Sequence, residues 1–276
     1  MADRHGDAQP DADINRWVEA LIARHTAAFS RPEFLKAVRA LSARYVERRR
    51  ELEHRSPIDS AGKRAGFAAL FAPLHFFTVR GVIRALADDG APVSPLDEII
   101  DLGSGTGVAS AAWALALARP ARLVGVDRDP WMTGEAVWNW HRLGVTGRSE
   151  RSDMITVAER LAARLPLGSR GRRALVMGWS VNELAPASRE RLLSALIPLA
   201  ERGVRILIVE PLARSAVPWW NDWVDALGAV GARADEWKLD VPLPPALADL
   251  DEAAGFRRSA LGARSIWVAS GSPEPI

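Results

Sequence analysis

The chain has 276 residues, of which 48% are hydrophobic and 25% charged, so it is long enough and apolar enough to bury a core. It contains no cysteine, which excludes disulfide bonds, thiolate metal sites and a cysteine nucleophile. The formal net charge is +2, and most of the basic residues are arginine, so the distribution of charge says more than its total.

The N-terminal sequence MADRHGDAQPDADINRW is polar and acidic, whereas targeting sequences begin with basic and then apolar residues. The longest apolar run, residues 109–118, is too short to span a bilayer. We therefore expect a soluble, cytoplasmic protein without a membrane partner.

The first part of the chain has the apolar spacing of helices, from about residue 13 to residue 55 and again over FAALFAPLHFFTVRGVIRALADDG. Ser30 and Glu33 have the spacing of a capping box, with Pro32 in the first helical turn. The loop APVSPLDE follows and marks a boundary. These patterns predict a helical N-terminal region over residues 1–95, which could cap a site and select a substrate, and a second domain over residues 96–276.

Basic residues outnumber acidic ones ten to five between Arg31 and Arg64. Guanidinium groups bind phosphates through two parallel hydrogen bonds, so this region is a candidate surface for RNA or a ribosomal subunit. The alternative is a solvated helix surface whose arginines pair with nearby glutamates.

Short apolar runs then alternate with helical segments, which is typical of repeated strand–helix units around a parallel sheet. The sequence predicts an α/β fold with a Rossmann-like, doubly wound, seven-stranded and mostly parallel sheet. The expected strands are residues 98–102, 122–126, a weaker one near Arg151, 173–179, 204–209, 237–241 and 264–269.

The stretch EIIDLGSGTGVAS has glycine at every second position directly after the first expected strand. Glycine permits positive φ and close approach of a ligand to the main chain, and the following helix N-terminus favours an anionic group. The second strand ends at Asp127, which is placed to accept hydrogen bonds from ribose hydroxyls. A dinucleotide site would have a third glycine at the position of Val108, and this chain does not.

An acid followed by G-x-G-x-G resembles the first motif of the class I S-adenosylmethionine-dependent methyltransferases. The resemblance covers about residues 96–270 and implies S-adenosylmethionine as the cofactor. It implies that the loop approaches the methionine part of the cofactor, that Asp127 binds the ribose, and that Trp131 or Met132 lies near adenine. It also suggests that Asp153 contacts the adenine amino group, although the alternative of a structural role stays open. The implied cofactor-binding residues are Asp101, Gly103, Ser104, Gly105, Gly107, Asp127, Arg128, Trp131, Met132, Asp153, Trp179 and Asn182.

The sequence W-S-V-N-E-L after the fourth strand differs from the N-P-P-Y type of motif that is frequent in enzymes that methylate amino groups. More distantly, the Asn182-Glu183-Leu184 turn, Arg189 or Arg191, and the strand end Val209-Glu210-Pro211 resemble a methyltransferase-like family related to mitochondrial small-ribosomal-subunit assembly proteins. That family's cysteine cluster is missing here, so no metal site is expected.

Glu183 and Glu210 follow or end expected strands and are the candidate catalytic or substrate-contacting acids. His75 and His141 are weaker candidate bases, because each lies in or beside an apolar helix. Trp138 and Trp140 cannot share one helix face. The predicted function is an S-adenosylmethionine-dependent methyltransferase, with RNA slightly favoured as acceptor. A small-molecule methyltransferase and a non-catalytic, cofactor-binding ribosome assembly factor are the alternatives.

Overall fold

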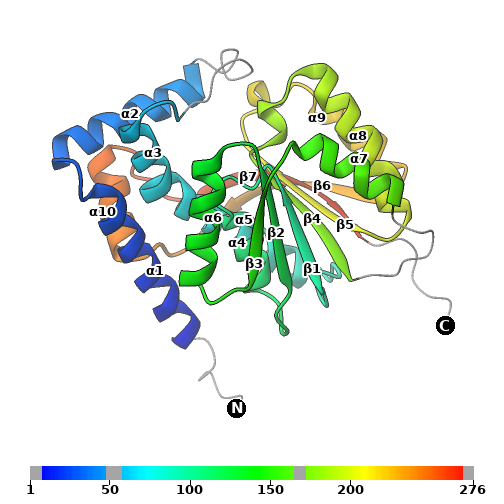
Figure 1. Ribbon diagram of the computed structural model, residues 1–276, viewed down its shortest axis with the longest axis horizontal. Helices are drawn as coiled ribbons and strands as arrows, with labels where there is room; N and C mark the ends of the chain where they lie inside the picture. Colours follow the sequence, from blue (N-terminus) through cyan, green and yellow to red (C-terminus); the bar gives the residue numbers. More distant parts are fainter. Residues whose placement is uncertain (1–7, 48–57, 165–171, 270–276) are drawn as a thin grey trace. The chain divides into compact units, whose positions relative to one another are not determined.

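The chain forms two compact units in the computed structural model, which describes residues 8–47, 58–164 and 172–269 (Figure 1). The first, the helical unit, comprises Met1–Phe77 and Asp240–Ala260. The second, the sheet unit, comprises Thr78–Leu239 and Leu261–Ile276. The helical unit thus ends before residue 95 and also includes residues 240–260. Along the chain, this segment connects two strands of the sheet unit, and no sequence pattern indicated that it belongs to the helical unit.

The helical unit contains α1 (Ala8–Thr26), α2 (Arg31–Glu47), α3 (Ala61–Gly66), the π-helical turn η2 (Phe67–Phe71), the start of α4 (Ala72–Asp88) and α10 (Pro245–Ala254). The expected interaction at the start of α2 is present, because the Ser30 N–H donates to the Glu33 carboxylate at 2.9 Å. The Arg39 guanidinium donates to the carbonyls of Ala253 and Ala254, at 3.1 and 3.2 Å, and so fastens the C-terminus of α10 to α2.

Among the described residues, one continuous helical stretch, Ala61–Asp88, is long and apolar enough to cross a membrane by length and composition. The apolar spacing of the sequence predicted a helix from residue 67 onward, but no segment long enough to span a bilayer. Of its most apolar 18-residue window, 83% is buried inside the protein, which is typical of a core helix of a soluble protein. The boundary between the two units falls within this stretch, after Phe77.

The sheet unit contains β1 (Glu98–Leu102), β2 (Arg122–Asp127), β3 (Gly147–Arg151), β4 (Arg173–Gly178), β5 (Arg205–Glu210), β6 (Ala232–Leu239) and β7 (Leu261–Val268). The strand order is β3-β2-β1-β4-β5-β7-β6. All neighbours pair in parallel except β7, which is antiparallel to both β5 and β6. The predicted seven-stranded, mostly parallel sheet is therefore confirmed.

Helices cover both faces of this sheet (Figure 1). On one face lie α7 (Met154–Arg164), α8 (Pro186–Glu201) and α9 (Trp220–Gly228), whose apolar residues share one core cluster with alternate residues of the strands, such as Ile100 and Leu102. On the other face lie α5 (Val108–Ala114) and α6 (Pro130–Arg142), which contribute the fully buried Trp113 and Trp140. The short turns η3 (Val181–Glu183) and η4 (Arg214–Ala216) follow β4 and β5.

The edge strand β6 begins at residue 232, five residues before the expected start at residue 237, and β7 begins at residue 261 rather than 264. The start of β6 reads ARADEW, in which charged residues hide the strand pattern. Charged side chains are typical of an edge strand, because they discourage pairing with other chains.

Candidate functional site

The predicted site residues of the sheet unit gather at the carboxyl ends of β1, β2, β4 and β5. These four strands are neighbours and parallel, so their carboxyl ends lie at one edge of the sheet. The segments that follow them are the glycine loop (residues 103–107), Asp127 with α6, the β4 turn (residues 179–183) and Glu210. This is the edge at which open α/β sheets bind ligands.

The glycines of the glycine loop serve different purposes, although all three have positive φ. A Cβ at Gly103 would lie 2.5 Å from the Cβ of Ser180, and one at Gly107 would lie 2.7 Å from the indole ring of Trp140. A Cβ at Gly105 would meet one described atom within 4 Å, the Met132 Sδ at 3.9 Å. Gly103 and Gly107 are thus required by the protein's own packing, and Gly105 is the position where the loop backbone is left open.

Trp140 organises the loop from beneath, a role that the sequence analysis missed. Its ring would also clash with a Cβ at Gly125 in β2 and at Gly147 in β3, each at 2.7 Å. Its Nε1–H donates to the Gly107 carbonyl at 2.8 Å, and the neighbouring Asn139 amide donates to the Thr106 carbonyl at 3.0 Å. The glycine in the middle of LVGVD was the available signal, because glycine inside a strand marks a close approach. Trp138, as expected, lies on a different face and is half-buried.

Asp101 is 1% exposed and points toward α5, where its Oδ2 accepts from the Ser110 N–H at 3.1 Å. Its Oδ1 is buried and has no hydrogen-bond partner among the described residues. Burial raises the pKa of Asp101 to about 6, and the nearby Asp127 carboxylate acts in the same direction. The end of β1, directly before the glycine loop, therefore carries a buried acceptor atom without a partner among the described residues.

Asp127 fixes the glycine loop to the end of β2. Its Oδ2 accepts from the Gly105 N–H at 2.9 Å, and its Oδ1 accepts from the Asp129 N–H at 2.9 Å. Burial raises its pKa, and these hydrogen bonds act against the increase. Each carboxylate oxygen retains a further lone pair, so the side chain can also accept from a ligand hydroxyl.

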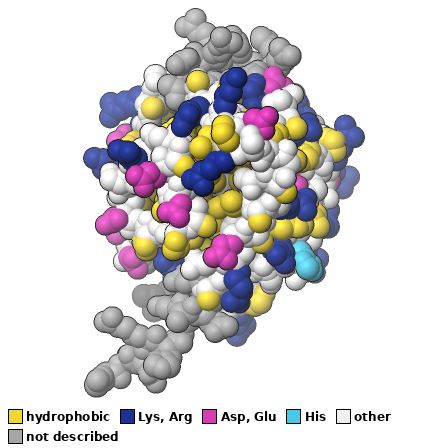
Figure 2. All heavy atoms as spheres, turned by 90° about the vertical axis from the view of Figure 1, so that its left-hand side faces the viewer, with side chains coloured by type: hydrophobic (Ala, Val, Ile, Leu, Met, Phe, Trp, Pro, Cys, Tyr) yellow, Lys and Arg dark blue, Asp and Glu magenta, His cyan; other side chains and the backbone are white. Residues whose placement is uncertain are grey.

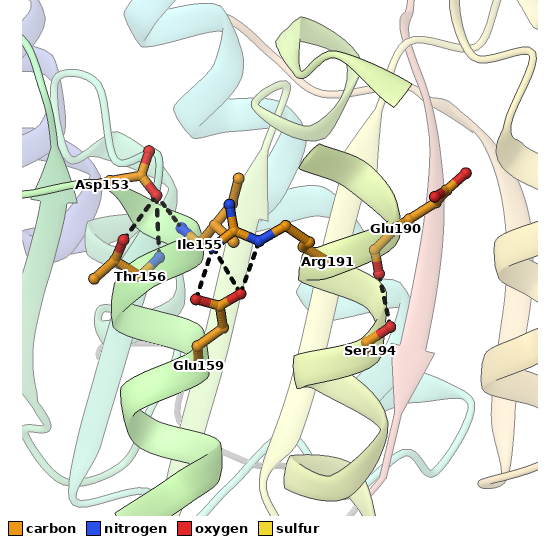
Figure 3. A network of polar contacts seen from close by, with 7 residues as sticks. All are labelled: Asp153, Ile155, Thr156, Glu159, Glu190, Arg191 and Ser194. Atoms are coloured by element: carbon orange, nitrogen blue, oxygen red, sulfur yellow. Dashed lines mark hydrogen bonds and ion pairs between the residues drawn. The ribbon is translucent and has the colours of Figure 1, made fainter. Parts of the chain in front are cut away.

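Asp153 and α6 occupy the neighbouring positions. Asp153 Oδ1 caps α7 by accepting from the N–H groups of Ile155 and Thr156, both at 3.0 Å (Figure 3). Its Oδ2 lies 3.7 Å from the exposed Arg128 guanidinium. The Oδ1 atom of Asp153 thus has a structural role as a helix cap, which the sequence left open. Its Oδ2 atom faces the Arg128 guanidinium at the end of β2. Met132 lies beside Gly105, and the Trp131 N–H donates to Asp129 at the start of α6.

The β4 turn is held by Glu210, which is fully buried at the end of β5. Glu210 Oε1 accepts from the N–H groups of Val181 and Asn182, at 3.0 and 3.2 Å, and its Oε2 accepts from the Asn182 amide at 2.5 Å. Burial raises the pKa of Glu210 to about 8. Its oxygens are therefore directed at the turn. Trp179 begins the turn with a φ of 55°, which is uncommon for a residue other than glycine and is concentrated at functional sites.

Glu183 ends the β4 turn and is half-buried. Its carboxylate makes no hydrogen bond or ion pair with the residues that the structure describes. Burial and the neighbouring Asp127 carboxylate raise its pKa to about 7, and Arg128 acts against the increase. Of the two acids predicted to contact substrate, Glu183 has the free carboxylate and Glu210 supports the turn that carries it.

The two candidate histidines are not brought together. His75 belongs to the helical unit, where burial and the nearby Arg258 lower its pKa to about 3, and His141 is exposed on α6. Within the described residues, no group of three His, Cys, Asp or Glu side chains could hold a metal ion.

The predicted phosphate-binding region is described only in part, because residues 48–57, and with them Arg48, Arg49, Arg50 and Arg55, lie outside the described residues. Arg39 binds the end of α10, and Lys63 forms an ion pair with Asp59 at 2.7 Å. Arg31 and Lys36 are exposed and have no ion-pair partner within the described part of this region.

The Arg189 and Arg191 side chains have different partners. Arg189 donates to the Leu184 carbonyl and so closes the β4 turn. Arg191 joins α8 to α7 through the Glu159 carboxylate, at 2.9 and 3.0 Å (Figure 3). Only Arg189 therefore belongs to the surroundings of the site.

No protein-family model matches the sequence, and no curated protein matches it. Among solved structures, an O-methyltransferase family protein from Burkholderia thailandensis is similar with a TM-score of 0.51 and 11% identity, over 84% of this chain and 63% of that one. A SAM dependent methyltransferase from Aquifex aeolicus is similar with a TM-score of 0.45 and 13% identity, over 72% of this chain and 93% of that one. At sequence identities this low, the similarity shows the fold and does not show the activity. The chain therefore has the fold of the class I S-adenosylmethionine-dependent methyltransferases, as the sequence resemblance predicted.

Proposed function

We propose that the protein is an S-adenosylmethionine-dependent methyltransferase that binds its methyl donor at the glycine loop. The observation that carries the proposal is the open backbone at Gly105, which lies between Asp101 and Asp127. The residues present fit the donor. Gly105 leaves space that a side chain would fill, and the buried Asp101 Oδ1 is an acceptor without a partner among the described residues.

In this proposal the glycine loop and Asp101 hold the amino-acid part of the donor, and Asp127 accepts from the ribose hydroxyls. Met132 and Trp131 on α6, with Arg128 and Asp153, form the side toward the adenine ring. Trp179 and Asn182 complete the site from the β4 turn, and Ser104 contributes from within the loop. When bound, S-adenosylmethionine supplies an electrophilic methyl group on a sulfonium centre.

The chain's own contribution to transfer is alignment and exclusion of water, because an in-line displacement depends mainly on geometry. The β4 turn is suited to this, since Glu210 fixes two of its backbone N–H groups and Arg189 fixes the carbonyl of Leu184, the residue that follows it. A rigid turn holds Trp179 and Glu183 at constant positions. Glu183 can accept a proton from the acceptor at neutral pH, because its pKa is raised to about 7.

Isothermal titration calorimetry with S-adenosylmethionine tests the donor site. Asp127→Ala and Gly105→Val should each weaken binding at least about tenfold, since one removes charge-assisted hydrogen bonds and the other fills the open backbone. Asp222→Asn, at an exposed position of α9, and Gly90→Ala, in a turn with free space around it, are matched controls that should bind normally. Unchanged binding by both site variants would refute the donor site.

For the acceptor we propose a small molecule first. The support is local, because the β4 turn offers one aromatic ring and one free carboxylate, an arrangement suited to a compact group that carries a proton. Tritiated methyl transfer into fractionated cell extract tests this without assuming a substrate. Label in the low-molecular-weight fraction supports the proposal. Absence of label from every fraction, with donor binding intact, would favour the non-catalytic assembly factor.

RNA is the second candidate acceptor, favoured by the exposed Arg31 and Lys36 on α2. Binding to RNA through these cations should weaken as salt increases, because phosphate contacts release counterions. Electrophoretic shifts of total RNA between 20 and 200 mM salt, with Arg31→Ala/Lys36→Ala as the variant, measure this. No shift at the lowest salt would exclude this candidate.

A further inference from the structure

Three acidic side chains lie on one side of the proposed donor site, at the β4 turn and at the strand ends beside it. Asp127, Glu183 and Glu210 come from the end of β2, the turn after β4 and the end of β5. The Asp127 carboxylate raises the pKa of Glu183, and the Glu183 carboxylate raises the pKa of Glu210. The oxygens of Asp127 and Glu210 accept backbone hydrogen bonds, whereas the Glu183 carboxylate has no hydrogen bond or ion pair with described residues. Glu183 is thus the acid of the three whose carboxylate has no partner among the described residues.

The cations near Glu183 do not neutralise it. Arg128 is the one that acts on its carboxylate, and that guanidinium is exposed and shared with Asp153 at 3.7 Å. Arg189 on α8 is the first basic residue after the turn in the sequence, and it donates to the Leu184 carbonyl. A second acceptor in the same cluster, the buried Asp101 Oδ1, also lacks a partner among the described residues. Both unpartnered groups favour a positively charged ligand.

We infer that Glu183 makes this site prefer a cationic ligand to its neutral counterpart, so that the sulfonium donor binds more tightly than the thioether product left after transfer. This inference rests on the proposed function, because the donor and the product differ there by one methyl group and one positive charge. A unit charge opposite the sulfonium strengthens donor binding and leaves product binding nearly unchanged. Glu183 is then a specificity-determining residue, and Glu210 is the positioning residue that fixes the turn beneath it.

Affinity ratios test the inference without an acceptor. Calorimetry gives the dissociation constants of S-adenosylmethionine, S-adenosylhomocysteine and sinefungin, an analogue with an ammonium group in place of the sulfonium. At pH 8 the wild-type protein should favour both cationic ligands over S-adenosylhomocysteine, by about tenfold from one partly screened charge pair. Glu183→Gln should abolish most of that preference, and Glu183→Asp should keep part of it. Glu190→Gln, an exposed glutamate on α8 whose carbonyl, not its carboxylate, binds Ser194, is the matched control.

Proton release gives a second readout. Near pH 7 about half of the Glu183 side chains are protonated, so a cationic ligand should expel up to about half a proton on binding. Titrations in two buffers of different ionisation enthalpy measure this release. It should be larger for S-adenosylmethionine than for S-adenosylhomocysteine in the wild-type protein, and equal for both in Glu183→Gln.

The outcomes separate the two claims. If neither S-adenosylmethionine nor S-adenosylhomocysteine binds the wild-type protein, the proposed function is wrong, and this inference fails with it. If S-adenosylmethionine and S-adenosylhomocysteine both bind, but the ratio of their dissociation constants and the proton release are the same in the wild-type protein and in Glu183→Gln, the inference alone is wrong. If the ratio changes in Glu190→Gln as well, the preference comes from the total charge of the protein, which also overturns the assignment to Glu183.

Discussion

Replacing single glycines of the glycine loop by alanine should separate its two roles, which are close packing at Gly107 and an open backbone at Gly105. Gly107→Ala adds a methyl group that would lie 2.7 Å from Trp140, and Gly105→Ala adds one that has open space apart from Met132 at 3.9 Å. Gly90→Ala is the control, because Gly90 also has positive φ and no described atom within 4 Å of the new Cβ. All three glycines have positive φ, so each substitution carries a penalty of the same kind, and larger differences between the variants report the surroundings.

The magnitudes follow from two terms. Placing alanine in the left-handed region costs about 1–2 kcal/mol of unfolding free energy, which should be the whole effect at Gly90 and Gly105. Overpacking against a buried ring costs about 1–3 kcal/mol more, so Gly107→Ala should lose about 2–5 kcal/mol in total. Ligand affinity should follow a different order from stability: Gly105→Ala should weaken binding most, because its methyl group fills space beside the loop backbone where the donor is proposed to lie. We expect S-adenosylmethionine to bind Gly105→Ala several-fold more weakly than Gly90→Ala.

Urea unfolding followed by tryptophan fluorescence and far-ultraviolet circular dichroism measures the first effect, and calorimetry measures the second. If Gly107→Ala is no less stable than Gly90→Ala, Trp140 moves aside at little cost and the packing argument is wrong. If Gly105→Ala binds S-adenosylmethionine as tightly as the wild-type protein, the open backbone is not where the donor lies.

Further predictions concern pH, packing and the helical unit. The pKa of Glu210 is raised to about 8 by burial, so the folded chain holds a proton that the unfolded chain releases near pH 4.5; unfolding free energy should therefore fall as pH rises from 5 to 8. Glu210→Gln should reduce that fall by at least about 1 kcal/mol in urea titrations at each pH, and an equally steep fall in this variant would contradict the assignment. Trp140→Phe should cost about 1–3 kcal/mol, because the Nε1–H bond to Gly107 is lost from a buried site; a thermal unfolding shift below 1 °C would argue against this. Asp251→Ala should destabilise the helical unit by about 3 kcal/mol, because it leaves the partly buried Arg258 without its partner; hydrogen exchange in α10 compared with β1 would reveal whether the loss is confined there.

Much of the sheet could be predicted from the sequence, because the information is local. The strands β1, β2, β4 and β5 are short apolar runs, and each ends within one residue of its expected position. The link between an acid, a glycine loop and a second acid is also a local pattern, and it led to the fold that the structure has.

The contacts that assign roles within the site could not be predicted, because they join residues far apart in the chain. Gly107 packs against a tryptophan 33 residues later, and Glu210 binds a turn that lies 28 and 29 residues earlier. Nothing in the sequence indicates that Glu210 holds the β4 turn in place, whereas Glu183 is part of that turn and has a free carboxylate among the described residues. The membership of residues 240–260 in the helical unit is equally hidden, since it depends on contacts of α10 with α1 and α2.

Trp140 also has a consequence for sequence variation at this fold position. Its ring excludes side chains at Gly107, Gly125 and Gly147, which come from a loop and two different strands. Substitutions at these three glycines should therefore show epistasis with position 140, because a smaller side chain there would relieve the clash with the ring at each of them. A second close neighbour remains for each new Cβ: Ala136 Cβ at 2.8 Å for Gly107, Ser104 Oγ at 2.9 Å for Gly125 and Leu123 Cβ at 2.8 Å for Gly147. A double variant such as Gly147→Ala with Trp140→Leu should then be more stable than the sum of its single effects. Positions 107, 125, 140 and 147 are expected to vary as one group among related chains.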